Sequence, residues 1–168
     1  MVYQYCPKCG SKYEKSETTK FFCNKCGNIV YLNSKPTAST LIVDGNKVLL
    51  GKRRIEPKKG KWDVIGGFLE YSEHPEDGAK REAKEETGLD IEIEKLLGIF
   101  MDEYETDKYA TLNICYVARV VGGEETPGDD IEELKWFEPT ELPKDIAFKN
   151  GKDMLEEWLV KSNFNSNI

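Results

Sequence analysis

Short apolar runs separated by turn residues make up much of this chain and predict β-strands. The runs at 37–43 and 47–53 flank Asp44-Gly45-Asn46, and a glycine-containing loop between two apolar runs indicates a β-hairpin. The same alternation of apolar and polar positions predicts four more strands. These strands lie at 62–65, 91–104, 109–121 and 133–137.

Two other segments have the periodicity of a helix. The segment 75–87 begins with Pro75, which suits a first helical turn, and stops before Gly88, which suits a C-terminal cap. Strands in this order, together with two helices, predict an α/β fold with a mixed sheet and helices on both faces. The second helix, at 150–161, has an apolar stripe formed by Met154, Leu155, Trp158 and Leu159.

The helix at 75–87 carries an unusual concentration of carboxylates. At 100° per residue, Glu82, Glu85 and Glu86 fall within an arc of about 100°. Like charges at this spacing destabilise a helix, and a hard divalent cation with oxygen ligands would offset their repulsion. A solvated charged face is the alternative explanation for this short run taken alone. The wider spacing G-x5-E-x7-R-E-x2-E-E-x-G would arise by chance in about one of 10⁵ chains of this composition.

This spacing resembles the Nudix box, the signature of hydrolases that act on nucleoside diphosphates linked to another moiety. The chain departs from the usual pattern at Ala83, where a larger aliphatic residue is common, and at Ile65, where proline is common. The resemblance implies a Nudix-type α/β/α sandwich and a metal-dependent hydrolysis of a diphosphate bond. The matching positions are Gly67, Glu73, Arg81, Glu82, Glu85, Glu86 and Gly88.

The resemblance also implies roles for the residues of the box. Mg²⁺ or Mn²⁺ ions would bridge the phosphate oxygens of the substrate and activate a water nucleophile. Arg81 would hold the box carboxylates through bidentate contacts, with Glu73 as the favoured partner. The Gly66-Gly67 pair would turn the backbone closely before the box. The expected metal ligands are the Gly67 carbonyl and the carboxylates of Glu82, Glu85 and Glu86.

The general base and the substrate contacts are less well defined by the sequence. The resemblance implies that the base is either a box glutamate or a glutamate on a later loop, and a solvated acidic loop is the alternative interpretation of the downstream segment. A basic loop that balances an acidic protein, or packing at a strand edge, explains the substrate candidates equally well. The downstream base candidates are Asp130, Glu132 and Glu133, and the candidate substrate-binding residues are Arg53, Arg54 and Tyr104.

Four cysteines near the N-terminus form the pattern C-x2-C-x13-C-x2-C, which is typical of a structural zinc ribbon. A disulfide pair or a redox C-x-x-C is the competing explanation. We expect a ribbon at 1–34, a short linker at 33–37 that leads into a Nudix domain at 35–162, and a frayed tail at 163–168. The expected zinc ligands are Cys6, Cys9, Cys23 and Cys26.

The charge of the chain limits its partners. With 168 residues and a formal charge of −7, the chain lacks the basic excess of a general nucleic-acid binder, so we do not expect nucleic acid as a partner. It also lacks a long apolar run and a signal-peptide pattern, so no membrane association and a cytoplasmic location are expected. Residues 1–35 carry six lysines and two glutamates. The favoured role of the ribbon is that of a structural appendage. The alternatives are electrostatic docking on the catalytic domain of the same chain, a contact in a homodimer, and a contact with nucleic acid.

The residues that come after the box rank the candidate substrates. The region 90–108 lacks the SQPWPFPxS-like array of NADH pyrophosphatases. We therefore rank ADP-ribose or a similar nucleotide-sugar first, dinucleoside polyphosphates and NAD(H) next, and nucleoside triphosphates last. A non-catalytic nucleotide sensor that binds nucleic acid through the ribbon is a further alternative, but it would not need every metal ligand. An isomerase would need a catalytic cysteine, and Cys115 is the one cysteine outside the ribbon.

Overall fold

The structure is a computed structural model that describes residues 3–14, 19–104 and 109–164. The chain divides into two units. The first, here called the ribbon unit, comprises Met1–Lys35 and Glu103–Thr111, and the second, the sheet unit, comprises Pro36–Asp102 and Leu112–Ile168. The boundary at Lys35/Pro36 lies one residue from the predicted start of the Nudix domain. The predicted linker at 33–37 was wrong in its second half, because the first strand of the large sheet begins at Lys35.

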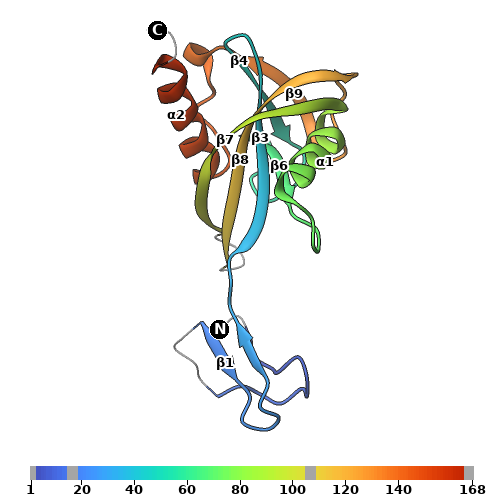
Figure 1. The fold of residues 1–168 in the computed structure, drawn as a ribbon, viewed down its shortest axis with the longest axis vertical. Helices are drawn as coiled ribbons and strands as arrows, with labels where there is room; N and C mark the ends of the chain where they lie inside the picture. Colours follow the sequence, from blue (N-terminus) through green and yellow to red (C-terminus); the bar gives the residue numbers. More distant parts are fainter. Residues whose placement is uncertain (1–2, 15–18, 105–108, 165–168) are drawn as a thin grey trace. The chain divides into compact units, whose positions relative to one another are not determined.

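A seven-stranded sheet forms the centre of the sheet unit (Figure 1). Its strand order is β5-β4-β3-β8-β7, with β6 paired to β3 and β9 paired to β4. The predicted hairpin is confirmed, since Asp44 pairs with Lys47 across a two-residue loop. The strands are β3 (Lys35–Asp44), β4 (Lys47–Arg53), β5 (Trp62–Asp63), β6 (Ile65–Phe68), β7 (Leu89–Tyr104), β8 (Tyr109–Gly123) and β9 (Ile131–Phe137).

Two α-helices and one 3-10 turn accompany the sheet. Helix α1 (Pro75–Thr87) has the predicted bounds, because His74 caps its first turn and Gly88 ends it with a φ of 71°. Helix α2 (Lys149–Phe164) extends beyond the prediction at both ends, and its Asn150 amide donates to Asp102 at 3.1 Å. The turn η1 spans Pro139–Glu141. Within the described residues, no helix has the length and apolar content needed to span a membrane.

The two helices cover opposite faces of the sheet, and Figure 1 shows the strands between them. Leu41 on β3 packs in a core cluster with Met154 and Trp158 of α2. Its neighbour Ile42 packs in a second cluster with Ala83 of α1. Because successive residues of a strand point to opposite faces, these contacts confirm the predicted sandwich. Helix α1 therefore packs on one face of the sheet and α2 on the other.

The segment before α1 differs from the prediction. The single strand expected at 62–65 is broken at Val64, so that β5 pairs with β4 while β6 pairs with β3. Gly66 lies inside β6, not in a turn, with a φ of 148°. A Cβ at this position would lie 2.3 Å from the carbonyl oxygen of Ala38. The glycine is therefore required for the close approach of two strands.

The ribbon unit contains a small antiparallel pair, β1 (Lys20–Phe22) and β2 (Ile29–Tyr31). Phe21 on β1 is buried with Cys6, Tyr13 and Cys23. This core is small, and a unit of some thirty residues needs a further source of stability, for which a metal is a common solution.

Candidate active site

Glu82, Glu85 and Glu86, here called the glutamate stripe, line one cavity of about 550 Å³ in the sheet unit. They lie on α1, whose adjoining face buries Ala79 and Ala83 against the sheet. Small residues on that face bring the helix close to the strands and leave the carboxylates at the edge. The cavity is lined by Glu82, Glu85, Glu86, Gly128, Asp129 and Asp130.

Arg81 organises the carboxylates around it. Its Nε donates to Glu73 Oε1 at 2.8 Å and its Nη2 donates to Glu73 Oε2 at 2.9 Å, which is the predicted bidentate contact. Nη1 donates to Glu82 at 2.7 Å and to Glu85 at 3.2 Å. The hydrogen bonds that Glu73 accepts from Arg81, together with one from the Glu70 amide, lower the pKa of Glu73 to about 2. Arg81 therefore fixes the orientation of two stripe carboxylates while Glu73 fixes Arg81.

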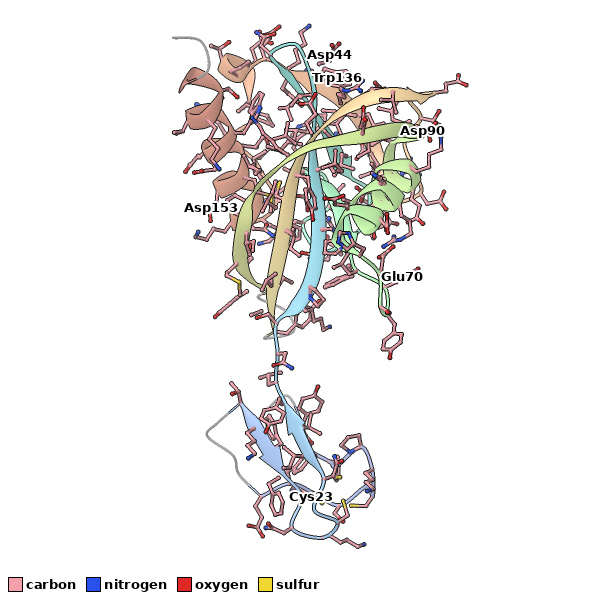
Figure 2. The ribbon with its side chains drawn as sticks, viewed as in Figure 1. Cys23, Asp44, Glu70, Asp90, Trp136 and Asp153 are labelled. Atoms are coloured by element: carbon pink, nitrogen blue, oxygen red, sulfur yellow. The ribbon has the colours of Figure 1, made fainter. Side chains whose placement is uncertain are left out.

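Arg81 also contacts the backbone of the loop between β6 and α1, which the sequence did not indicate. Arg81 Nη2 also donates to the Phe68 carbonyl at 3.1 Å, and the Glu70 amide donates to Glu73 at 2.9 Å. Glu70 is labelled in Figure 2, on the loop that leads into α1. The same arginine thus joins this loop to the middle of the helix.

Each stripe carboxylate keeps one oxygen available for a cation. Arg81 occupies Glu82 Oε1 and Glu85 Oε2, and the Gly66 amide donates to Glu86 Oε2 at 2.9 Å. Within the described part of the chain, the second oxygen of each has no protein donor. Burial is the main cause that raises the pKa of Glu86 to about 8, and the nearby Glu82 and Asp63 charges act in the same direction. An all-oxygen donor set with excess negative charge fits a hard divalent cation such as Mg²⁺ or Mn²⁺.

Gly67 lies directly against Glu82. A Cβ built on Gly67 would lie 2.6 Å from the Glu82 carboxylate carbon, so no larger residue fits without moving that carboxylate. This packing explains why glycine stands at the position. The coordination of a metal by the Gly67 carbonyl remains a prediction.

Gly67→Ala is expected to lower kcat/KM by about 10–100-fold, because small misplacements of an active-site group have effects of this size. The added methyl group meets the end of a flexible side chain, so the melting temperature should change little. Gly122→Ala is the matched control, since its Cβ would come no closer than 3.5 Å to Asp90. Steady-state kinetics and thermal melts check both variants. Full activity of Gly67→Ala would contradict the placement of Glu82 in the active site.

The loop before β9 closes the other side of the cavity by capping α1. The Thr126 amide donates to the Thr87 carbonyl at 2.8 Å, and the Gly128 amide donates to the Glu86 carbonyl at 2.9 Å. These bonds satisfy carbonyls that a helix leaves unpaired at its C-terminus. They also bring Asp129 and Asp130 to the glutamate stripe. A Cβ on Gly128 would lie 2.2 Å from the Glu85 carbonyl oxygen, so this contact requires glycine.

The structure separates the predicted base candidates. Asp130 lines the cavity, and so does Asp129, which was not among the predicted residues. In the sequence, only the position of Asp129 next to Gly128 could have indicated this. That position places Asp129 at the cavity because the Gly128 amide contacts α1. Glu132 and Glu133 do not line the cavity; they lie on β9, where Glu132 forms an ion pair with Lys52 at 3.3 Å.

The candidate substrate residues have different environments. Arg54 supports the acidic loop, since its amide donates to the Asp130 carbonyl at 2.7 Å and its Nη1 to the Asp129 carbonyl at 3.3 Å. Arg53 forms a partly buried ion pair with Asp63 at 3.1 Å. Burial raises the pKa of Asp63 to about 6, although Arg53 opposes the shift. The side chain of Tyr104 lies outside the described part of the structure.

The four cysteine sulfurs of the ribbon unit lie within 4.8 Å of one another. Cys23 is labelled in Figure 2. The Sγ atoms of Cys6 and Cys26 are 3.7 Å apart, and those of Cys9 and Cys23 are 3.6 Å apart. A tetrahedron with Zn–S bonds of about 2.3 Å has edges of about 3.8 Å, whereas a disulfide requires about 2 Å. The sulfur geometry therefore fits zinc and excludes disulfides among these four residues.

Comparisons with known proteins agree with this geometry. The NUDIX domain family model matches residues 33–159. An ADP-ribose pyrophosphatase of Methanocaldococcus jannaschii is 35% identical over 143 residues, which cover 85% of this chain and 83% of that protein. The NAD-capped RNA hydrolase NudC of Vibrio atlanticus is 29% identical over 86% of this chain, and the match spans 52% of NudC.

Solved structures show the same relationship. The crystal structure of a NUDIX hydrolase from Nitrosomonas europaea matches with a TM-score of 0.81 at 28% identity, over 96% of this chain and 93% of that one. The family match covers more than half of the chain, and the relative from M. jannaschii exceeds 30% identity over most of its length. The chain therefore belongs to the Nudix hydrolase family and is a pyrophosphohydrolase.

Proposed function

We propose that this enzyme uses Mg²⁺ or Mn²⁺ to hydrolyse the diphosphate bond of a nucleoside diphosphate linked to another moiety, with ADP-ribose or a similar nucleotide-sugar as the preferred substrate. The observation that carries the proposal is the single cavity in which three glutamates of α1 meet two aspartates of the loop before β9. The ADP-ribose pyrophosphatase name of the M. jannaschii relative supports the substrate class. The NudC relatives support NAD(H) as the second candidate, although the chain spans about half of their length.

Each group in the site has a defined task in this proposal. Glu82, Glu85 and Glu86 hold the divalent ions through the oxygens that Arg81 and Gly66 leave without a hydrogen bond. Those ions, when bound, neutralise the charge of the phosphates and make water a stronger nucleophile. Arg81 orients two of the three carboxylates, so it is a positioning residue.

The aspartates of the loop are the best candidates for the general base. Asp129 and Asp130 face the same cavity as the stripe, and both are exposed, so either can accept a proton from the attacking water and return it to solvent. The contacts of the loop with α1 and Arg54 hold it in place.

Replacement of the base is expected to lower kcat by about 10²–10⁴-fold, the usual contribution of general base catalysis. We expect this loss in Asp129→Asn or in Asp130→Asn, together with loss of the acidic limb of the pH–rate profile. Glu133→Gln removes the same charge from nearby β9 and should leave kcat unchanged. Normal turnover in both aspartate variants would exclude the loop as the source of the base.

The substrate assignment is tested directly with a panel of compounds. The enzyme is incubated with ADP-ribose, NADH, diadenosine polyphosphates and nucleoside triphosphates, each with Mg²⁺ or Mn²⁺, and released nucleotides are separated and measured. The highest kcat/KM is expected for ADP-ribose. A preference for NADH would move the assignment to the second candidate, and no hydrolysis of any compound would overturn the proposal.

In the ribbon unit, we infer a structural Zn²⁺ held by Cys6, Cys9, Cys23 and Cys26. The sulfur spacing and the small core of the unit support this role. Thiolate ligands from four cysteines leave no open coordination position, so the ion would stabilise the fold and take no part in hydrolysis.

A further inference from the structure

One face of the β1–β2 hairpin exposes large side chains that the ribbon core does not use. Residues directly opposite in an antiparallel pair share a face, and Lys20 lies opposite Tyr31 while Phe22 lies opposite Ile29. We call these four residues the hairpin face. The alternate pair, Phe21 and Val30, points the other way, into the cysteine cluster.

The exposure of this face is high for aromatic residues. Phe22 is 53% exposed and Tyr31 is 57% exposed, and Ile29 beside them is 43% exposed. Aromatic rings normally bury most of their surface, and a contiguous patch of exposed apolar side chains marks an interaction site. Phe22 and Tyr31 lie diagonally across the strand pair on this exposed face, and neither belongs to the core around the cysteines.

The charge of the ribbon unit indicates the kind of partner. Residues 1–35 carry six lysines and two glutamates, a formal charge of +4, so the remaining residues carry −11 of the total of −7. A zinc ion with four thiolates contributes about −2, which still leaves the segment positive. The Nζ atom of Lys20 lies 5.8 Å from the centre of the Tyr31 ring, so a cation accompanies the aromatic surface. The acidic total of the chain therefore averages two parts of opposite sign.

We propose that the hairpin face binds single-stranded nucleic acid. Exposed aromatic rings stack on bases, and neighbouring lysines contact the phosphates, which is the combination that proteins use for single strands. Phe22 and Tyr31 would each stack on a base, and Lys20 would contact the backbone. A duplex does not suit this face because its bases are already stacked on one another. This proposal rests on the ribbon unit alone and is independent of the hydrolase reaction.

The test measures binding of a fluorescent single-stranded RNA of about 12 nucleotides with a 5′-hydroxyl end, by anisotropy, with the full chain and without Mg²⁺ or Mn²⁺. This RNA has no diphosphate bond, so binding is measured apart from hydrolysis. Phe22→Ala and Tyr31→Ala are each expected to weaken binding by about 5–150-fold. Tyr71→Ala, which removes a fully exposed aromatic residue of the sheet unit, is the matched control and should bind normally.

Further variants separate base stacking from apolar contact and from charge attraction. Phe22→Leu and Tyr31→Leu keep an apolar side chain but remove the ring, and they should lose nearly as much affinity as the alanine variants. Lys20→Ala should reduce the slope of log K against log salt by about 0.7, the value for one phosphate of a single strand. Zinc content equal to that of the native protein shows that each variant is folded.

Three results would overturn the proposal. These are no binding at low salt, equal competition by duplex RNA, and aromatic variants that bind as well as Tyr71→Ala. Self-association of the chain that depends on Phe22 and Tyr31, without any binding of RNA, would identify the face as a protein interface instead.

Discussion

Glu86→Gln is expected to lower kcat/KM by about 10³-fold or more while the fold remains intact. Several kcal/mol of transition-state stabilisation depend on the bound cations, and each 1.4 kcal/mol is about tenfold in rate. The amide oxygen of Gln can still accept the hydrogen bond from the Gly66 amide, which preserves the local structure. Steady-state kinetics with saturating Mg²⁺ or Mn²⁺ measure the loss. Glu133→Gln on β9 is the control.

The same variant has an opposite effect on the metal-free protein. Burial raises the pKa of Glu86 to about 8, so the folded state favours the protonated carboxyl group. The stability associated with that proton is present below the unfolded pKa near 4.5 and is lost as the pH rises through about 8. Gln carries no such proton. Glu86→Gln should therefore match the native protein at low pH and exceed it by several kcal/mol at pH values above about 8.

Urea unfolding at pH 5 and at pH 9, in buffer free of Mg²⁺ and Mn²⁺, measures this difference. Addition of Mg²⁺ should then stabilise the native protein more than the variant, because a ligand stabilises a fold according to its affinity for it. Full turnover by Glu86→Gln would contradict the hydrolase site. Equal pH dependence of the two proteins would contradict the burial of this carboxylate.

The second large effect is expected in the ribbon unit. Cys23→Ala should abolish zinc binding and unfold the β1–β2 hairpin, because structural zinc contributes about 10–16 kcal/mol in small domains of this kind. Cys23 is 2% exposed and packs with Phe21, so its loss also removes part of the small core. The sheet unit, with its own two core clusters, should remain folded.

Metal analysis and hydrogen exchange test this prediction. The native protein should contain one zinc per chain, and the amides of Phe21 and Val30 should lose protection in the variant. Cys115→Ala is the matched control, since Cys115 is buried in the core of the sheet unit and its loss should leave zinc content unchanged. A hairpin that stays protected without zinc would refute the structural role of the metal.

Part of the active site could be predicted from the sequence because it is local. Helix α1 has its predicted bounds because Pro75, Gly88 and the period of the helix act within a few residues. The contact between Arg81 and Glu73 follows from their positions at the two ends of one short loop-and-helix segment.

Other features depend on segments far apart in the chain. Asp129 enters the cavity because the Gly128 amide caps a carbonyl of α1 more than forty residues earlier, and no local pattern contains that contact. Glu133 was predicted as a base candidate together with Asp130, but it lies within β9 and does not line the cavity. The predicted role of Gly66 was wrong for the same reason, since the close strand that requires a glycine begins at Lys35.

The sequence by itself determined the family resemblance, the carboxylate stripe and the four-cysteine pattern, because each depends on spacing within one segment. Only the tertiary structure decided which acidic loop residues meet the stripe and why glycine is needed at Gly66 and Gly128. It also showed that Phe22 and Tyr31 share an exposed face, which depends on the register of two strands. The physical reason is the same throughout: hydrogen bonds and close packing between distant segments leave no periodic signal in the chain.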